Sequence, residues 1–130
     1  MSDAFDSDVL IYVARNDPYA PDVRCAMDRA QDLIGSVVLL PEVLSKPIAT
    51  GDADEYDELV RLLARFDLKA ADSEIADAAA HLGAKYRLRA ADAIHLATAV
   101  VWGADRFHTN NRKDFGPRIE EVEVVWPSVS

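Results

Sequence analysis

The sequence contains a single cysteine, Cys25, so no disulfide can form within the chain. It has no run of about 20 apolar residues, the length that spans a bilayer, and its first residues lack the basic-then-apolar pattern of a secretion signal. Internal repeats, low-complexity tracts and Gly/Ser linkers are also absent. These absences indicate a cytoplasmic protein, without membrane contact, folded as one domain over residues 1–130. Cys25 lies in a helical pattern, so we expect it to be a small core residue.

Basic residues are in the minority. The 14 Lys and Arg stand against 23 Asp and Glu, which gives a formal net charge of -9 at pH 7. This balance excludes a broad basic surface for nucleic acid. Any bound nucleic acid must therefore be held locally, for instance through metal ions. Half of the residues are apolar, which is enough for one sizeable core in a chain of this length.

The apolar pattern alternates between strand-like and helix-like segments. Short strands are predicted at about residues 3–6, at the apolar run VVLL (37–40), at RFHT (106–109) and at VEVV (122–125). Helices are predicted over 21–34, ended by Gly35, then from Pro41 onward, and over 52–66, 73–86 and 89–102. This order is typical of a three-layer α/β/α sandwich with a mainly parallel central sheet.

Acid and amide side chains follow three of the predicted strands. Asp6 ends the first strand, Glu42 lies two residues beyond VVLL, and Asn111 and Asp114 follow RFHT. In open α/β sheets, sites form beyond the carboxyl ends of the strands. We therefore expect these side chains to meet at one rim of the sheet.

Asp92 is the only charged residue between Arg89 and Asp105, in a helix made mostly of apolar residues. An unpaired buried carboxylate is costly, so Asp92 needs a partner or a function. A salt bridge to Arg89 or Arg15 is the structural alternative to a role as a metal ligand. His95, three residues after Asp92, is interpreted as a packed, hydrogen-bonded histidine rather than as a ligand.

Several carboxylates at one rim repel one another, and a divalent cation removes this conflict. Oxygen ligands suit hard ions such as Mg²⁺ or Mn²⁺, and the sequence has no Cys/His cluster of zinc spacing. The sequence therefore predicts a Mg²⁺ or Mn²⁺ site.

The segments FDSDVLIY, LPEVLSKP, LRAADAIHLATA and FHTNNRKDF resemble, in this order, the four motifs of PIN-domain ribonucleases, in particular the VapC-type toxins of toxin–antitoxin pairs. The resemblance covers essentially the whole chain, and ADAIHLATA followed by TNNRKDF is its most specific part. It implies a Mg²⁺-dependent endoribonuclease in which an activated water attacks the RNA phosphodiester in line. It also implies a homodimer and a cognate antitoxin that inserts a segment into the acidic groove.

By this resemblance the acids of the site are Asp6, Glu42 and Asp92. Ser7 begins the helix after Asp6 and helps to hold the site, whereas Asp8 is expected to face elsewhere.

The fourth position departs from the family pattern. Many relatives carry an acid two residues after the threonine, but here Asn111 follows Thr109 at that spacing, so Asp114 is the available carboxylate. With fewer anionic ligands, a second metal ion is expected to bind only together with the RNA phosphate. Three cations near the motifs are candidates for phosphate contacts: Lys46, Arg112 and Lys113.

Two other functions remain open from the sequence. Asp6 and Asp8 also match the Asp-x-Asp pair of haloacid-dehalogenase-like phosphatases, in which the first Asp is the nucleophile and the second an acid/base. Against this, Leu10 stands where that pattern has Thr or Val, and no late Gly-Asp-x-x-x-Asp motif follows. The other alternative is a catalytically weak PIN-like RNA-binding protein, which Asn111 would favour.

Overall fold

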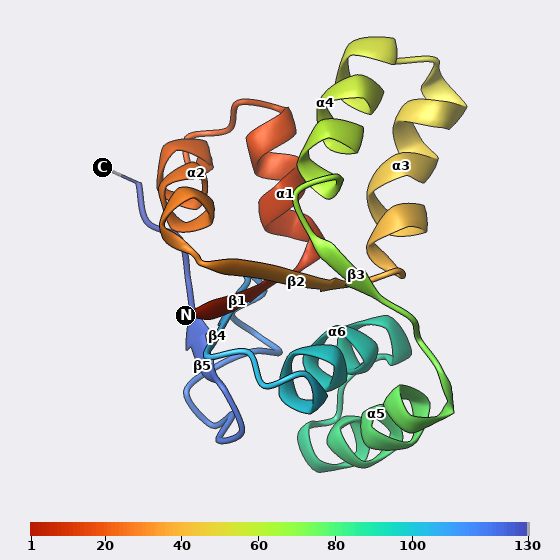
Figure 1. Ribbon diagram of the computed structural model, residues 1–130, viewed down its shortest axis with the longest axis vertical. Helices are drawn as coiled ribbons and strands as arrows, with labels where there is room; N and C mark the ends of the chain where they lie inside the picture. Colours follow the sequence, from red (N-terminus) through yellow and green to blue (C-terminus); the bar gives the residue numbers. More distant parts are fainter. Residues whose placement is uncertain (130) are drawn as a thin grey trace.

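The computed structural model describes residues 1–129, which form a five-stranded sheet covered by helices on both faces (Figure 1). The strands are β1 (Ser2–Phe5), β2 (Asp32–Ser36), β3 (Asp67–Lys69), β4 (Arg106–His108) and β5 (Glu123–Val125). The helices are α1 (Ser7–Ala14), α2 (Ala20–Arg29), α3 (Leu39–Thr50), α4 (Ala53–Leu63), α5 (Ser73–Tyr86) and α6 (Ala90–Val101).

The strand order is β3-β2-β1-β4-β5, and all four pairings between neighbours are parallel. Helices α1 to α4 cover one face, and α5 and α6 cover the other (Figure 1). The predicted three-layer sandwich is therefore confirmed. Since β1 is central, the residue that follows it lies between the ends of β2 and β4.

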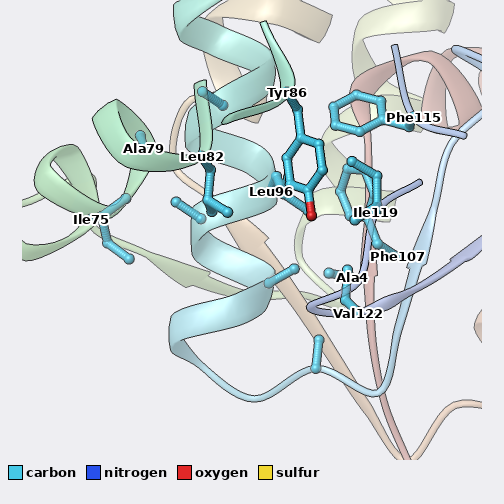
Figure 2. Close-up of a cluster of buried hydrophobic side chains, with 14 residues drawn as sticks. Ala4, Ile75, Ala79, Leu82, Tyr86, Leu96, Phe107, Phe115, Ile119 and Val122 are labelled. Atoms are coloured by element: carbon cyan, nitrogen blue, oxygen red, sulfur yellow. The ribbon is translucent and has the colours of Figure 1, made fainter. Parts of the chain in front are cut away.

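Each face of the sheet has its own hydrophobic core. Successive strand residues point to opposite faces, so Ala4 joins the core under α5 and α6 while Phe5 joins the core under α1 to α4. Figure 2 shows the first of these cores, in which Tyr86 and Leu96 lie beside Phe107. These two cores fix β1 from both sides.

Helix α5 has the bounds that the sequence predicts, and it buries Ile75, Ala79, Leu82 and Tyr86. Asp72 caps it, since its Oδ1 accepts a hydrogen bond from the backbone N–H of Ile75 at 3.0 Å. Asp52 caps α4 in the same way, with Glu55 as the donor at 3.1 Å. The acids at the start of α4 thus form a solvated helix start.

The second strand was predicted in the wrong place. It is β2 (Asp32–Ser36), whereas the apolar run at 37–40 forms a turn and the beginning of α3. The helix predicted over 21–34 ends at Arg29, because the chain enters β2 at Asp32. Four consecutive apolar residues at the start of a buried helix have the same pattern as a buried strand, and periodicity alone cannot separate the two.

Gly35 is a strand residue and not a helix terminator. A Cβ at this position would lie 2.7 Å from Cδ1 of Leu39 and 3.4 Å from Phe66 and Leu68. The glycine therefore permits the close approach of α3 to β2.

Two further expectations are corrected. The sequence did not predict β3, a three-residue strand at the sheet edge. Cys25 is exposed and not a core residue, because α2 buries Ala20, Val23 and Met27 on its opposite side. Among residues 1–129, no helix combines the length and the apolar character needed to cross a membrane.

Candidate functional site

Asp6 lies directly after the central strand and is 4% exposed. It caps α1, because its Oδ1 accepts a hydrogen bond from the N–H of Ser7 at 2.8 Å. Its Oδ2 accepts a hydrogen bond from the hydroxyl of Thr109, also at 2.8 Å, just after β4. The carboxylate is thus held by the start of α1 and by the residue after β4, at the rim that the sequence predicted.

Glu42 reaches the same rim from the first turn of α3, and its carboxylate is hydrogen-bonded to Nε2 of His95. His95 lies on α6 and is 2% exposed. Asp6, Glu42 and His95 each offer a ligand atom, and these three atoms lie within 4.8 Å of one another. His95 is packed and hydrogen-bonded, as expected, and its partner is Glu42, a contact that the sequence did not predict.

Asp92 is half-buried in the first turn of α6. Arg15 pairs instead with Glu55 at 3.1 Å, and no ion pair to Asp92 occurs within residues 1–129. Burial raises the pKa of the Asp92 carboxyl, and the charges of Asp6 and Asp114 raise it further. Asp92 therefore interacts electrostatically with Asp6, Glu42 and Asp114, and these four acids are called the acidic rim below. The salt-bridge alternative is wrong for the described residues.

Asn111 and Asp114 form a pair. The Asn111 side-chain amide donates to Oδ2 of Asp114 at 3.1 Å, and the Asp114 backbone N–H donates to Oδ1 of Asn111 at 3.4 Å. The Asn111 backbone N–H donates to Oγ1 of Thr109 at 3.1 Å, which fixes the turn after β4. Asp114 is close enough to raise the pKa of Asp92, but it lies outside the tight group of three ligand atoms.

Asp8 was expected to face elsewhere, and it is not among the three residues whose ligand atoms group together. Its Oδ2 accepts a hydrogen bond from the backbone N–H of Asn110 at 3.0 Å, so it ties α1 to the turn after β4. Burial and the charge of Asp6 raise the pKa of Asp8 to about 7. The Asp-x-Asp spacing was the signal for this residue, since both acids flank the start of one helix.

Asp3 is buried away from the rim. Its carboxylate accepts hydrogen bonds from Arg106 Nε at 3.1 Å and from His108 Nε2 at 2.6 Å. Burial lowers the pKa of His108, while the hydrogen bond to Asp3 acts in the opposite direction. This network joins β1 to β4. Of the three N-terminal aspartates, only Asp6 and Asp8 therefore approach the candidate site.

Burial and neighbouring charges shift the pKa values of the groups at the rim. Burial raises the pKa of Asp6, although His95, Thr109 and Ser7 act in the opposite direction. The hydrogen bond from His95 lowers the pKa of Glu42, and the Ser7 side chain lowers it further. Burial lowers the pKa of His95, but Glu42 and Asp6 outweigh it, so the net shift is upward.

These donors fit a hard divalent ion. The rim offers carboxylate oxygens that raise one another's pKa values, together with one imidazole and no thiolate. Such a set suits Mg²⁺ or Mn²⁺. The candidate ligands are Asp6, Glu42, Asp92 and Asp114, with Ser7, Thr109 and Asn111 in support.

A family model for the PIN domain matches residues 4–116 of the chain. The chain belongs to the PIN domain family. The match spans all four motifs and the acids of the rim, so the haloacid-dehalogenase alternative has no support from it. No curated protein sequence matches the chain at a significant level.

Solved structures of the PIN fold resemble the chain over nearly its whole length. A chain of VapBC2 from Rickettsia felis, bound to a promoter DNA fragment, has a TM-score of 0.76 at 15% identity and covers 98% of this chain and 100% of its own. A toxin–antitoxin complex from Klebsiella pneumoniae gives 0.75 at 23% identity, with coverages of 92% and 98%. VapBC-1 from Haemophilus influenzae gives 0.68 at 18% identity, with coverages of 96% and 97%. At these identities the likeness shows a shared PIN fold.

Proposed function

We propose that this PIN domain is the toxin of a type II toxin–antitoxin pair and acts as a Mg²⁺- or Mn²⁺-dependent endoribonuclease. The observation that carries the proposal is the acidic rim, where a buried carboxylate after the central strand is joined by acids from α3, α6 and the turn after β4. The similarity to chains of toxin–antitoxin complexes supports the toxin role.

Each residue has a distinct task in this proposal. Asp6 and Asp92 hold the metal, with Glu42 and Asp114 completing the set. A bound divalent ion supplies a water of lowered pKa and stabilises the charge that develops on the phosphate. His95 is a positioning residue, because it fixes the Glu42 carboxylate through a buried hydrogen bond.

Three support residues keep the first acid in place. Thr109 and the N–H of Ser7 hold the two oxygens of Asp6, so the rotamer of this carboxylate is set before any substrate arrives. Asn111 orients Asp114 through its amide. This preorganisation allows the rim to meet a phosphodiester without first rearranging.

The partner in this proposal is a cognate antitoxin, and the toxin forms a homodimer of single-domain chains (1–130) in the cytoplasm. An arginine from the antitoxin is suited to enter the acidic rim, because a guanidinium pairs with carboxylates in a bidentate manner. It would neutralise the rim much as a metal ion does.

The direct test is RNA cleavage by the purified protein with MgCl₂, with EDTA, and with the Asp6→Asn variant. We expect cleavage only for the wild type with Mg²⁺. Sequencing the RNA ends formed when the protein is expressed without its antitoxin would then identify the site of cutting. Cleavage that survives both EDTA and Asp6→Asn would refute the proposal.

A catalytically weak RNA-binding protein is the second candidate, and the Asn111–Asp114 pair favours it, since the fourth acid is already engaged by an amide. Calorimetric titration with Mn²⁺ separates the two. A scaffold without activity should release little or no heat, whereas a nuclease should bind the ion at its acidic rim.

A further inference from the structure

The basic side chains divide into two groups according to their partners. Seven of the 14 Lys and Arg residues pair with a carboxylate within residues 1–129: Arg15, Arg24, Arg61, Arg65, Lys69, Lys85 and Arg106. The other seven have no such partner among the described residues: Arg29, Lys46, Arg87, Arg89, Arg112, Lys113 and Arg118. The charges of this second group are not neutralised locally.

Six of these seven cations lie within five residues of an acid of the rim. Lys46 follows Glu42 by four positions on α3, which places both on one helix face. Arg87 and Arg89 precede Asp92. The others surround Asp114 in the sequence: Arg112, Lys113 and Arg118. Most of the cations without a carboxylate partner among the described residues therefore lie close in sequence to the acids of the candidate site.

Two of these segments are joined in space. The guanidinium of Arg118 donates to the backbone carbonyl of Tyr86 at 2.8 Å and to that of Asp114 at 3.4 Å. Tyr86 and Phe115 also belong to one core, and Figure 2 shows them side by side. The turn between α5 and α6 therefore lies against the segment after β4.

These cations differ in whether hydrogen bonds hold their side chains in place. Arg112 is fixed, because it donates to Asn110 Oδ1 at 2.8 Å and to the carbonyl of Pro127 at 2.9 Å. By contrast, Arg87, Arg89 and Lys113 are exposed, and their side chains make no hydrogen bond to the described residues. They are available to an external anion. The same holds for Lys46, but it lies on α3, outside the two joined segments.

The backbone at Arg87 supports a functional role. This residue ends α5 with a φ of 56°, in the left-handed conformation that favours glycine or asparagine at such a position. An arginine here departs from the local preference of the backbone. Departures of this kind occur where a side chain serves function.

We propose that Arg87, Arg89 and Lys113, defined here as the phosphate surface, hold the sugar–phosphate backbone of RNA beside the acidic rim. The inference rests on the proposed ribonuclease function. The three cations attract phosphates, and such contacts carry no base information; they also concentrate the substrate next to acids that would otherwise repel it. This surface explains how a chain of net charge -9 binds a polyanion.

The test is the salt dependence of RNA binding and cleavage. A triple variant, Arg87→Gln, Arg89→Gln and Lys113→Gln, is compared with the wild type on one single-stranded oligonucleotide over a KCl series. We expect KM to rise about tenfold or more with kcat within about twofold, because uniform binding is lost. The slope of log K against log salt should fall by about 2, since each phosphate contact on a single strand contributes about 0.7.

Two matched variants make the result specific. The triple variant Arg29→Gln, Arg61→Gln and Arg65→Gln changes the net charge equally, but away from the rim, and should leave the slope and KM close to those of the wild type. The charge-preserving variant Arg87→Lys, Arg89→Lys and Lys113→Arg should retain most of the binding. Equal losses in the two Gln variants would overturn the proposal, since net charge alone would explain them.

Fluorescence anisotropy with the same oligonucleotide in EDTA keeps the two proposals separate. If the wild type binds RNA and the first triple variant does not, the phosphate surface stands even if no RNA is cut. If the wild type cleaves RNA and the triple variant is unchanged, the surface is refuted and the nuclease stands. A variant that binds RNA normally but no longer forms a complex with co-expressed antitoxin would also overturn it, in favour of a protein-binding surface.

Discussion

Asp92 combines partial burial with repulsion from three other acids, and no Lys or Arg among the described residues pairs with it. Asp92→Asn should therefore leave the metal-free fold as stable as the wild type or more stable, because the amide is neutral. Cleavage should fall by about 100-fold or more, the effect of losing one electrostatic contact at a reacting centre. Circular dichroism melts in EDTA and an RNA-cleavage assay measure both effects. Full activity in the variant would exclude Asp92 from the site.

Asp114 and Asn111 offer a second comparison, because one carries charge and the other orients it. Asp114→Ala should weaken Mn²⁺ binding and turnover more than Asn111→Ala, which loses only a neutral amide. Asn111→Asp adds a charge to the rim and should lower the Mg²⁺ concentration for half-maximal cleavage. This concentration is measured for all four proteins on one RNA. An inactive Asn111→Ala beside a normal Asp114→Ala would make Asn111 the fourth ligand.

Asp8 gives a pH-dependent prediction. Its pKa in the folded protein, raised to about 7 by burial and by Asp6, exceeds the ordinary value of 3.8, so the native state binds the Asp8 proton more tightly than the unfolded chain does. Stability from this group is present at low pH and is lost as pH rises from about 4 to 7. Asp8→Asn keeps an acceptor for the N–H of Asn110 but removes the charge.

We therefore expect Asp8→Asn to melt at a higher temperature than the wild type at pH 8 in EDTA, and at about the same temperature at pH 4. Thermal melts at the two pH values measure this difference. The same variant should retain nuclease activity, since the Asp8 carboxylate serves the turn after β4. A loss of stability at pH 8 would show that the carboxylate, not only an acceptor, is required there.

At the level of elements, the contact between α3 and β2 depends on Gly35. Gly35→Ala would place a Cβ 2.7 Å from Cδ1 of Leu39, which is fully buried. Overpacking of this kind should lower the free energy of unfolding by about 1–3 kcal/mol, measured by urea denaturation. Gly116→Ala is the matched control, because its Cβ would lie at an ordinary 3.7 Å from the nearest atom, the Arg112 carbonyl oxygen. Equal effects at the two glycines would contradict the packing argument.

The elements that sequence analysis identified best are those with long regular patterns. Helix α5 shows its apolar residues at helical spacing over 14 residues, and its bounds were correct. Strand β2 was missed because its five residues have the pattern of a helix end. Strand β3 was missed because three residues, one exposed and two partly buried, carry too little pattern. Glu42 was predicted to reach the rim directly after a strand at 37–40. It does reach the rim, but from the first turn of α3, which is separated from β2 by a short turn.

The site was predictable where chain topology alone brings residues together. Asp6 and Thr109 follow neighbouring parallel strands, so their meeting at one rim follows from the fold class. The contact between Glu42 and His95 spans 53 residues and depends on how α3 and α6, which cover opposite faces of the sheet, both reach its rim, which no local pattern encodes. The link from Asp8 to the turn after β4 spans 102 residues and was missed for the same reason.

At the scale of the whole molecule, ionisation of the buried acids at the rim works against the folded state. The carboxyls of Asp6, Asp8 and Asp92 all have raised pKa values in the metal-free protein, so ionising them at neutral pH reduces stability. A ligand that binds only the native state adds RT ln(1 + [L]/Kd) to the free energy of unfolding. Under the proposed function, binding of a divalent cation is therefore expected to be thermodynamically linked to folding.

This linkage predicts that Mn²⁺ raises the melting temperature. At 100 times its Kd the ion should add about 2.7 kcal/mol of stability, measured by melts in MnCl₂ and in EDTA at constant ionic strength. Asp6→Asn should abolish the increase, because it removes the most buried acid of the rim. Asp54→Asn and Asp57→Asn, in the exposed acids of α4, should retain it. A shift that these control variants lose to the same extent would mean that Mn²⁺ screens the net charge of the whole chain instead of occupying one site.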